Sequence, residues 1–209
     1  MTFARIVSWA FHPLLLATYL FSLFTLFLPA GMHPIKDDGQ WKFVLLIFCV
    51  TFALPALNIF LFKALGTISS VMLDNRRERI IPFSFVSVLY VLITWLLYTR
   101  TRIGPNDNLL KFLVLIDVLV LVATLITFFY KVSVHSMAIW GFIGILLPLN
   151  KISEEGTLFA PTIIAILLAG VIMAARLQLN AHTPREVMVG AITGLMVSFG
   201  GMLVLFNLL

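Results

Sequence analysis

The sequence predicts an all-α fold, a polytopic bundle of about six to seven transmembrane helices. Of its 209 residues, 61% are hydrophobic and 11% are charged, whereas a soluble domain has about 45–50% apolar and about 25% charged residues. The mean hydropathy is +1.09, and the apolar residues form runs that reach the roughly 20 residues needed to cross a bilayer core. This composition excludes an ordinary cytosolic globule, a disordered tail and a nucleic-acid-binding module.

Seven apolar segments are long enough to be predicted spans, in chain order residues 6–30, 42–65, 80–98, 109–130, 133–149, 157–177 and 186–209. The first follows Arg5 as the core of a signal peptide would. It runs well past the about 7–15 residues of such a core, so we interpret it as a retained anchor. Little sequence remains outside the segments. We therefore expect a single integral membrane domain over residues 1–209, in a bacterial inner (plasma) membrane.

The connectors between these segments alternate between the two membrane faces. If all seven segments cross, residues 69–79, 131–136 and 178–185 share one face with the N-terminus, while turn-forming stretches such as 104–107 lie on the other. Almost every polar residue with a potential chemical role then lies on one side. Asp117, in the middle of the fourth segment, is the exception, and its carboxyl group either has a function or is buried in the protonated form.

The connector before the last segment combines a cation, an imidazole and a carboxylate. His182 and Glu186 are one helical turn apart if the helix begins near Thr183, so the carboxylate could bind one ring nitrogen and leave the other free as a nucleophile or base. Arg176 adds a planar donor group suited to phosphate oxygens. A structural interpretation stays open beside this one, because Thr183 and Glu186 fit a capping box with Pro184 at the first helical position. Both interpretations can hold together.

Two further clusters belong to the same side. His135 stands at the start of the fifth segment, where it could protonate a leaving-group oxygen. The alternative is an interfacial histidine with Ser133 as the helix N-cap. Before the third segment, Arg76, Arg77 and Arg79 are typical of lipid-headgroup anchors, unless one or two of them turn inward to hold a phosphate.

Together these clusters bring two histidines, a carboxylate and several arginines to one face of the predicted bundle. Phosphoryl transfer needs cations around the phosphate oxygens, a nucleophile in line and an acid for the leaving group. The sequence has no glycine-rich phosphate loop and no acidic cluster with metal-ligand spacing, and its single cysteine is Cys49. We therefore predict a phosphoryl-transfer site that needs no metal and no other cofactor.

At these residues the chain resembles the type 2 phosphatidic acid phosphatase (PAP2) superfamily. The third signature of that family is Ser-Arg, five residues, His, three residues, Asp. It is matched in spacing by Arg176, His182 and Glu186. Two departures are Ala175 in place of the serine and glutamate in place of the aspartate.

The other two signatures are matched less closely. Residues 132–135, Val-Ser-Val-His, resemble Pro-Ser-Gly-His, with valine in place of the proline and the glycine. The first signature is Lys, six residues, Arg-Pro. Here Arg79 is separated from Pro82 by two isoleucines, and Met72 stands in place of the lysine. All of the motifs lie within residues 74–186.

The resemblance implies a PAP2-like helical core and a metal-independent phosphatase. It implies that His182 attacks phosphorus to form a phosphohistidine, that Glu186 orients His182, and that His135 protonates the departing oxygen. The residues implied to hold the phosphoryl oxygens are Arg176, Arg79, Arg76 and Ser133. The implied substrate is a lipid phosphate or a polyprenyl (pyro)phosphate in a membrane-lipid environment, with no nucleic acid as a partner.

Two other classes of protein stay open. A degenerate PAP2-like binder or transporter of lipid phosphates would depend on the arginines and little on the histidines. A structural membrane subunit would depend on none of these clusters, and Arg176, His182 and His135 would not share a pocket.

Two features lie outside the motifs. His12, directly before Pro13, is interpreted as a helix-start residue at the membrane interface. Gly190 and Gly194 form a small-xxx-small pattern, which predicts close packing of the last helix on a neighbour behind His182.

Overall fold

The computed structural model describes residues 2–71, 73, 75–152 and 156–208, and in this part of the chain all regular structure is helical. The predicted all-α class is therefore confirmed. Met72, which stands in place of the signature lysine, and Asp74, where the expected motif range begins, lie outside the described residues.

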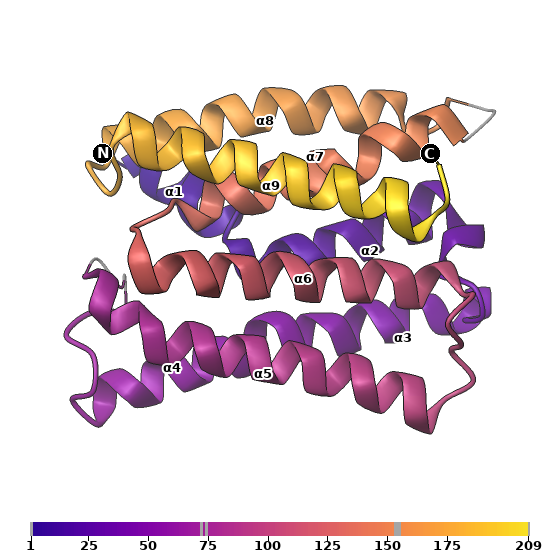
Figure 1. Cartoon of the computed structure of the whole chain (residues 1–209), viewed down its shortest axis with the longest axis horizontal. Helices are drawn as coiled ribbons and strands as arrows, with labels where there is room; N and C mark the ends of the chain where they lie inside the picture. Colours follow the sequence, from indigo (N-terminus) through magenta and orange to yellow (C-terminus); the bar gives the residue numbers. More distant parts are fainter. Residues whose placement is uncertain (1, 72, 74, 153–155, 209) are drawn as a thin grey trace.

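The helices run side by side along one long axis of the molecule (Figure 1). The N-terminal part consists of α1 (Thr2–Ala10), the 3₁₀ turn η1 (Pro13–Leu15), α2 (Leu16–Phe27), the 3₁₀ turn η2 (Pro29–Met32), α3 (Asp37–Phe48), the π-helical turn η3 (Cys49–Ala53) and α4 (Leu54–Ala64). The remainder consists of α5 (Arg76–Arg100), α6 (Asn108–Phe129), α7 (Val134–Ile152), α8 (Phe159–Gln178) and α9 (Pro184–Leu205).

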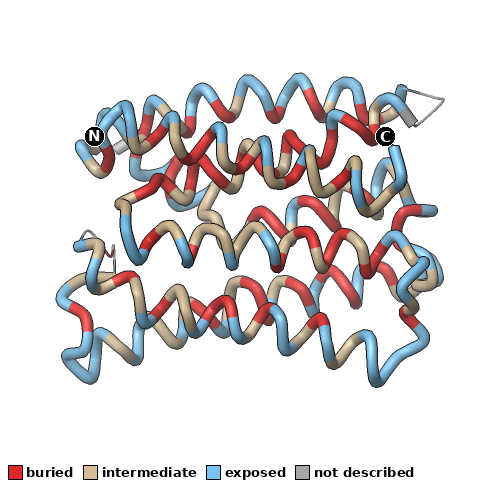
Figure 2. Tube along the Cα trace, viewed as in Figure 1, coloured by how far each residue is buried: buried red, intermediate tan, exposed pale blue. Residues whose placement is uncertain are grey.

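Within the residues that the structure describes, six stretches are long and apolar enough to cross a membrane, which agrees with the predicted six to seven spans. They are Phe3–Phe27, Asp37–Ala64, Arg76–Arg100, Asn108–Phe129, Phe159–Gln178 and Pro184–Leu205. The predicted fifth span corresponds to α7, which is not among the six although it runs alongside them (Figure 1). Between Val134 and Asn150 only Leu147 is exposed. Helix α7 is therefore almost completely surrounded by the other helices (Figure 2). A helix surrounded by protein can carry polar residues that a lipid-facing helix cannot.

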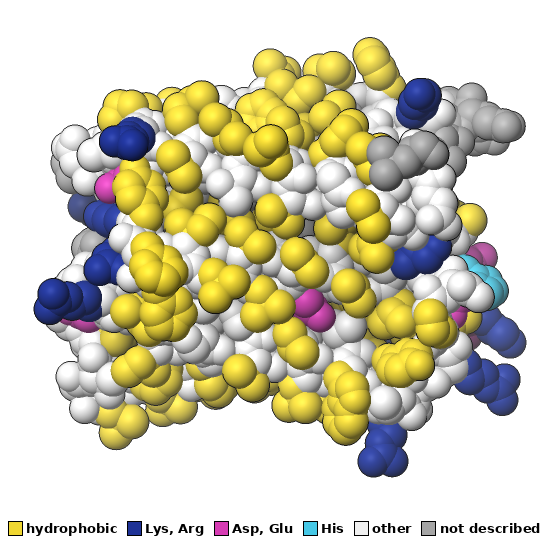
Figure 3. Space-filling view, in the orientation of Figure 1, with side chains coloured by type: hydrophobic (Ala, Val, Ile, Leu, Met, Phe, Trp, Pro, Cys, Tyr) yellow, Lys and Arg dark blue, Asp and Glu magenta, His cyan; other side chains and the backbone are white. Residues whose placement is uncertain are grey.

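The outer surface has the distribution of side chains that a bilayer requires. On the face in Figure 3, hydrophobic side chains cover the middle of the molecule, and lysine and arginine side chains gather at its two ends. The ends of the helices therefore coincide with the charged zones, as expected for a protein whose middle lies in hydrocarbon.

The first predicted segment is interrupted by a break between α1 and α2. His12 has extended backbone angles, φ −61° and ψ 137°, and Pro13 opens η1. The break has a local cause, since a proline disfavours the α conformation in the residue before it and lacks the N–H of a regular helix. As a result, His12 lies at a corner of the backbone inside an otherwise apolar segment.

Helices α7 and α9 are in close backbone contact, as the glycine pattern predicted. A Cβ atom added at Gly190 would lie 2.5 Å from the carbonyl oxygen of Ser133, and one added at Gly194 would overlap the carbonyl oxygen of Met137. Both positions therefore need glycine, and the contact fixes the start of α9 against the start of α7.

The connectors predicted to share one membrane face do lie at one end of the bundle. The starts of α5, α7 and α9 and the end of α8 are at the same end as the N-terminus, while the C-terminus is at the opposite end (Figure 1). This arrangement brings the three motif-bearing connectors close enough to build one site.

Candidate active site

A pocket at this end of the bundle collects residues from most of the candidate clusters. Its histidine and arginine side chains are those of His135 of α7, Arg176 of α8, His182 of the α8–α9 connector, Arg79 of α5, and His12. The rest of the lining is largely apolar. The sharing of one pocket by Arg176, His182 and His135 is the outcome that a purely structural membrane subunit does not predict.

Glu186 holds His182 by a short hydrogen bond, with 2.7 Å between the imidazole Nδ1 and the carboxylate Oε2. The His182 side chain is fully buried, and that of Glu186 is 15% exposed. The same carboxylate oxygen accepts from the backbone N–H of Thr183 at 3.3 Å, and the Thr183 hydroxyl accepts from the N–H of Glu186 at 3.3 Å. The capping box and the histidine contact therefore coexist, and the cap fixes the carboxylate that orients the ring.

This contact determines which nitrogen of His182 is available. A carboxylate accepts the hydrogen bond, so Nδ1 carries the proton and Nε2 carries the lone pair in the neutral ring. Nε2 is buried and has no hydrogen-bond partner among the described residues, and the ring lines the pocket. Burial lowers the pKa of His182 below its ordinary value, and the nearby charges of Arg79 and Arg176 lower it further, against the opposing effect of Glu186. A neutral ring with a free Nε2 can act as a nucleophile or a base.

His135 is held in a similar way, but by a backbone carbonyl group. Its Nε2 lies 3.1 Å from the carbonyl oxygen of Ser8 in α1. Because a carbonyl oxygen only accepts, Nε2 carries the proton. Nδ1 is buried without a hydrogen-bond partner among the described residues. Nδ1 is therefore the ring nitrogen of His135 that could exchange a proton with a ligand.

Two arginines supply positive charge to the pocket. Arg79 is only 4% exposed, and its guanidinium donates to the carbonyl oxygens of Leu73, at 2.6 Å, and Val132, at 3.2 Å. Arg176 donates from Nη1 to the hydroxyl of Ser8 at 3.3 Å. Both guanidinium groups are close enough to His182 to act on its protonation, so an anion beside His182 would be attracted by two fixed cations.

Arg76 and Ser133 are not among the residues that line this pocket. Arg76 donates from Nη1 to the carbonyl oxygens of Thr127, at 3.1 Å, and Phe128, so it caps the C-terminal end of α6. The Ser133 hydroxyl accepts from the N–H of Ser136 at 3.4 Å, which is the N-cap role given above as the alternative for this residue. The structure therefore separates these two residues from His182, His135, Arg176 and Arg79, which line the pocket, and from Glu186, which binds His182.

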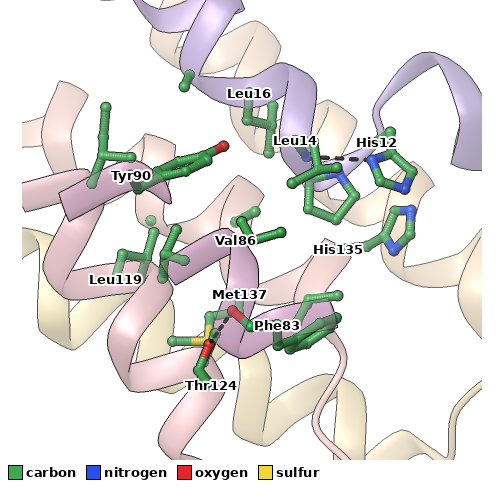
Figure 4. Close-up of a pocket in the computed structure, with 18 of the residues that line it drawn as sticks. His12, Leu14, Leu16, Phe83, Val86, Tyr90, Leu119, Thr124, His135 and Met137 are labelled. Carbon is green, nitrogen blue, oxygen red and sulfur yellow. Dashed lines mark hydrogen bonds between the residues drawn. The ribbon is translucent and has the colours of Figure 1, made fainter. Parts of the chain in front are cut away.

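The motifs in the sequence did not indicate that the first segment contributes residues to the site. Ser8 binds both His135, through its carbonyl group, and Arg176, through its hydroxyl group. His12 lines the pocket, and its ring centroid lies 5.6 Å from that of His135 (Figure 4). The His12–Pro13 pair is a polar break inside an apolar run, and this break is the feature of the sequence that could have indicated a role for His12. Nothing in the sequence distinguished Ser8.

The fold and the pocket together define a class of protein, an all-helical membrane bundle with a histidine and arginine site at one end. Residues 127–208 match the family model of the PAP2 superfamily, so this part of the chain, which contains α7, α8 and α9, is a PAP2 superfamily domain. The resemblance to this superfamily is thereby confirmed. No curated protein and no solved structure matches the chain.

A PAP2 superfamily domain implies a lipid phosphate phosphatase-type activity on phosphate-ester substrates, and members of this superfamily are typically metal-independent. Among the described residues, no three His, Cys, Asp or Glu side chains come together as a potential metal site. Arg79, Ser8 and His12 lie outside the matched range. Part of the pocket is therefore built by segments that the family model does not cover.

Proposed function

We propose that the protein is a membrane phosphatase that hydrolyses a lipid phosphate or a polyprenyl (pyro)phosphate through a phosphohistidine intermediate. The observation that supports this most strongly is the state of His182. Its Nδ1 is held by Glu186, and its unpartnered Nε2 lies in a pocket that also contains Arg79 and Arg176. A fixed nucleophile beside fixed cations is what an in-line attack on a phosphoryl group needs.

The apolar part of the pocket supports a lipid substrate. On α5 the lining continues from Arg79 through Phe83 and Val86 to Tyr90, and eleven residues of helix extend for about 16 Å. The pocket has a volume of about 180 Å³. A phosphate group bound near His182 would therefore leave room for an apolar chain deeper in the bundle (Figure 4).

In the first step, His182 Nε2 forms a bond to phosphorus, and the bond between phosphorus and the leaving oxygen breaks. The leaving oxygen takes a proton from Nδ1 of protonated His135. Glu186 stabilises the positive charge that develops on His182 through its hydrogen bond to Nδ1. Arg79 and Arg176 stabilise the charge on the phosphoryl oxygens.

In the second step, water attacks the phosphohistidine. Its proton passes to Nδ1 of His135, the bond between phosphorus and Nε2 breaks, and neutral His182 is restored together with protonated His135. The sum is one phosphate ester and one water converted to one alcohol and one phosphate. The Ser8 carbonyl group keeps His135 in place in both steps, because it binds the nitrogen that does not exchange its proton.

We also propose that residues 1–209 act as one integral membrane domain in a bacterial inner (plasma) membrane. Supporting this, the pocket combines residues of the PAP2 superfamily domain, such as His135 and Arg176, with residues from outside it, such as His12 and Arg79. The six helices of the described chain that are long and apolar enough to span a membrane fit this location.

The test is a phosphate-release screen with the full-length protein in detergent micelles, using phosphatidic acid, phosphatidylglycerophosphate and a polyprenyl pyrophosphate, each with excess chelator. We expect release from at least one substrate, and none above background from a folded His182→Ala variant. Release that stops on chelation would contradict the metal-independent mechanism. Binding without release in the native protein would favour the binder or transporter class.

A further inference from the structure

His12 is a third histidine in the pocket, and no motif or matched range includes it. It lies between α1 and η1, and its ring lines the same cavity as His135, Arg176 and His182. Its extended backbone conformation, followed by Pro13 at the start of η1, fixes its position at the corner of the chain. The local fold therefore directs this side chain toward the polar end of the pocket.

The state of the His12 ring follows from its contact with η1. Nδ1 accepts a hydrogen bond from the backbone N–H of Leu14 at 3.3 Å (Figure 4). Because that N–H can only donate, Nδ1 holds the lone pair, and the proton of the neutral ring is on Nε2. The hydrogen bond from Leu14 therefore selects the neutral tautomer of His12 in which Nε2–H is free to donate a hydrogen bond.

The His12 ring lies next to His135, the proposed acid. His12 and His135 lie edge to face, with ring centroids 5.6 Å apart and an angle of 78° between the ring planes, and Figure 4 shows them together at one end of the cavity. The Arg176 guanidinium acts electrostatically on both rings. Hence a phosphate group between Arg176 and His135 would lie beside His12 as well.

We propose that His12 is a substrate-contacting residue, which donates a hydrogen bond from Nε2–H to the phosphate group of the substrate. The proposal rests on the function proposed above, since it uses the same bound phosphate, and it involves no proton transfer from His12. It gives the pocket a donor from the first segment beside its two guanidinium groups. A hydrogen bond to a charged group is worth about 10- to 100-fold in affinity or rate.

The competing explanation is that His12 only caps η1. A cap of this kind needs one acceptor atom, and Asn, Asp or Ser supply it better than most residues. His12→Asn should therefore keep the acceptor for the Leu14 N–H and remove the ring donor from the pocket. His12→Ala removes both. His33→Asn is the matched control, because the His33 side chain is 77% exposed and pairs with Asp107, away from the pocket-lining residues.

The experiment measures three quantities for these variants in detergent: kcat and KM for phosphate release from dioctanoyl phosphatidic acid, the inhibition constant of orthovanadate, and the thermal unfolding midpoint with and without orthovanadate. For His12→Asn we expect kcat/KM to fall and the orthovanadate inhibition constant to rise by about 10- to 100-fold, with an unchanged midpoint in the absence of ligand. For His12→Ala we expect the same losses together with a lower midpoint. His33→Asn should match the native protein.

Native kinetics and native orthovanadate affinity for His12→Asn would overturn the proposal and leave His12 as a cap. The change in the unfolding midpoint on adding orthovanadate measures binding of the anion, so this part of the test does not depend on turnover. If the native protein releases no phosphate, the proposed function fails, and a weaker orthovanadate-induced shift in His12→Asn still supports the contact of His12 with the anion. If orthovanadate produces no shift in the native protein either, both proposals are overturned.

Discussion

The two sides of the pocket are held by different kinds of interaction. On one side, α7 and α9 touch through backbone at Gly190 and Gly194. On the other side, the first segment packs through apolar side chains of the core, such as Val7 and Leu20, and its polar contacts with the site, like those of Arg79 at the start of α5, are individual hydrogen bonds. We infer that the α7–α9 contact sets the separation of the proposed nucleophile His182 from the proposed acid His135, and that the other side supplies further groups that bind the phosphate and its lipid.

The largest effect is expected from breaking the α7–α9 contact. Gly194→Ala would place a methyl group against the Met137 carbonyl oxygen and cost about 1–3 kcal/mol of stability. It would also separate His182 from His135, so activity should fall more than stability does. Gly200→Ala is the matched control on the same helix, since an added Cβ there has no neighbour within 4 Å. Thermal unfolding and phosphate release measure both effects, and equal behaviour of the two variants would contradict this role of the contact.

A second prediction concerns the charge that orients His182. Glu186→Gln should lower kcat/KM by about 10- to 100-fold, as is usual when a supporting partner of a functional histidine is lost. The carboxylate raises the pKa of His182 against the effect of burial, so its removal lowers that pKa further. The neutral, nucleophilic ring then persists to lower pH, and the acidic limb of the pH profile of kcat/KM should move to lower pH.

In the native protein, this acidic limb should already lie below pH 6.5, because the pKa of His182 is lowered from its ordinary value. Glu78→Gln serves as the control, since Glu78 at the start of α5 binds Ser69 and does not line the pocket. An acidic limb of Glu186→Gln that moves to higher pH would show that the carboxylate does not act on His182 in this way.

The other side can be tested with Arg79, which is buried and lines the pocket, and Arg76, which is half-buried and does not line it. Arg79→Lys should raise KM by about 10-fold, because lysine cannot bind the Leu73 and Val132 carbonyl oxygens and a phosphate through one planar group. Arg76→Lys should act mainly on the thermal midpoint, because Arg76 caps α6. A larger change in KM for Arg76→Lys than for Arg79→Lys would reverse the assignment of the two residues.

The smallest effect is expected in the apolar part of the pocket. Ala138 lines it on α7, and Ala138→Phe should reduce the rate with long-chain phosphatidic acid relative to the dioctanoyl form by about 10-fold, the scale of one lost apolar contact in a pocket. Leu147→Phe, at an exposed position on the same helix, is the control. An unchanged chain-length preference in Ala138→Phe would place the lipid chain elsewhere.

Much of the α7–α9 side could be predicted from the sequence, because its determinants are local. The four-residue spacing of His182 and Glu186 and the glycines one turn apart each specify a short-range geometry. The other side depends on packing between distant segments. The contact of Ser8 with His135 and Arg176 arises only when α1 packs beside α7 and α8, and sequence spacing alone could not distinguish Arg79, which faces the pocket, from Arg76, which caps α6.

The central claim is that His182 becomes phosphorylated during turnover. Its most direct test is rapid acid-free quenching of the native protein with phosphatidic acid, followed by mass spectrometry of the peptide that contains His182. We predict a transient phosphoryl group on His182 that disappears as the alcohol product accumulates, and none in His182→Ala. Turnover with the phosphoryl group on a different residue, or with no phosphorylated peptide at any time before the product forms, would contradict the mechanism.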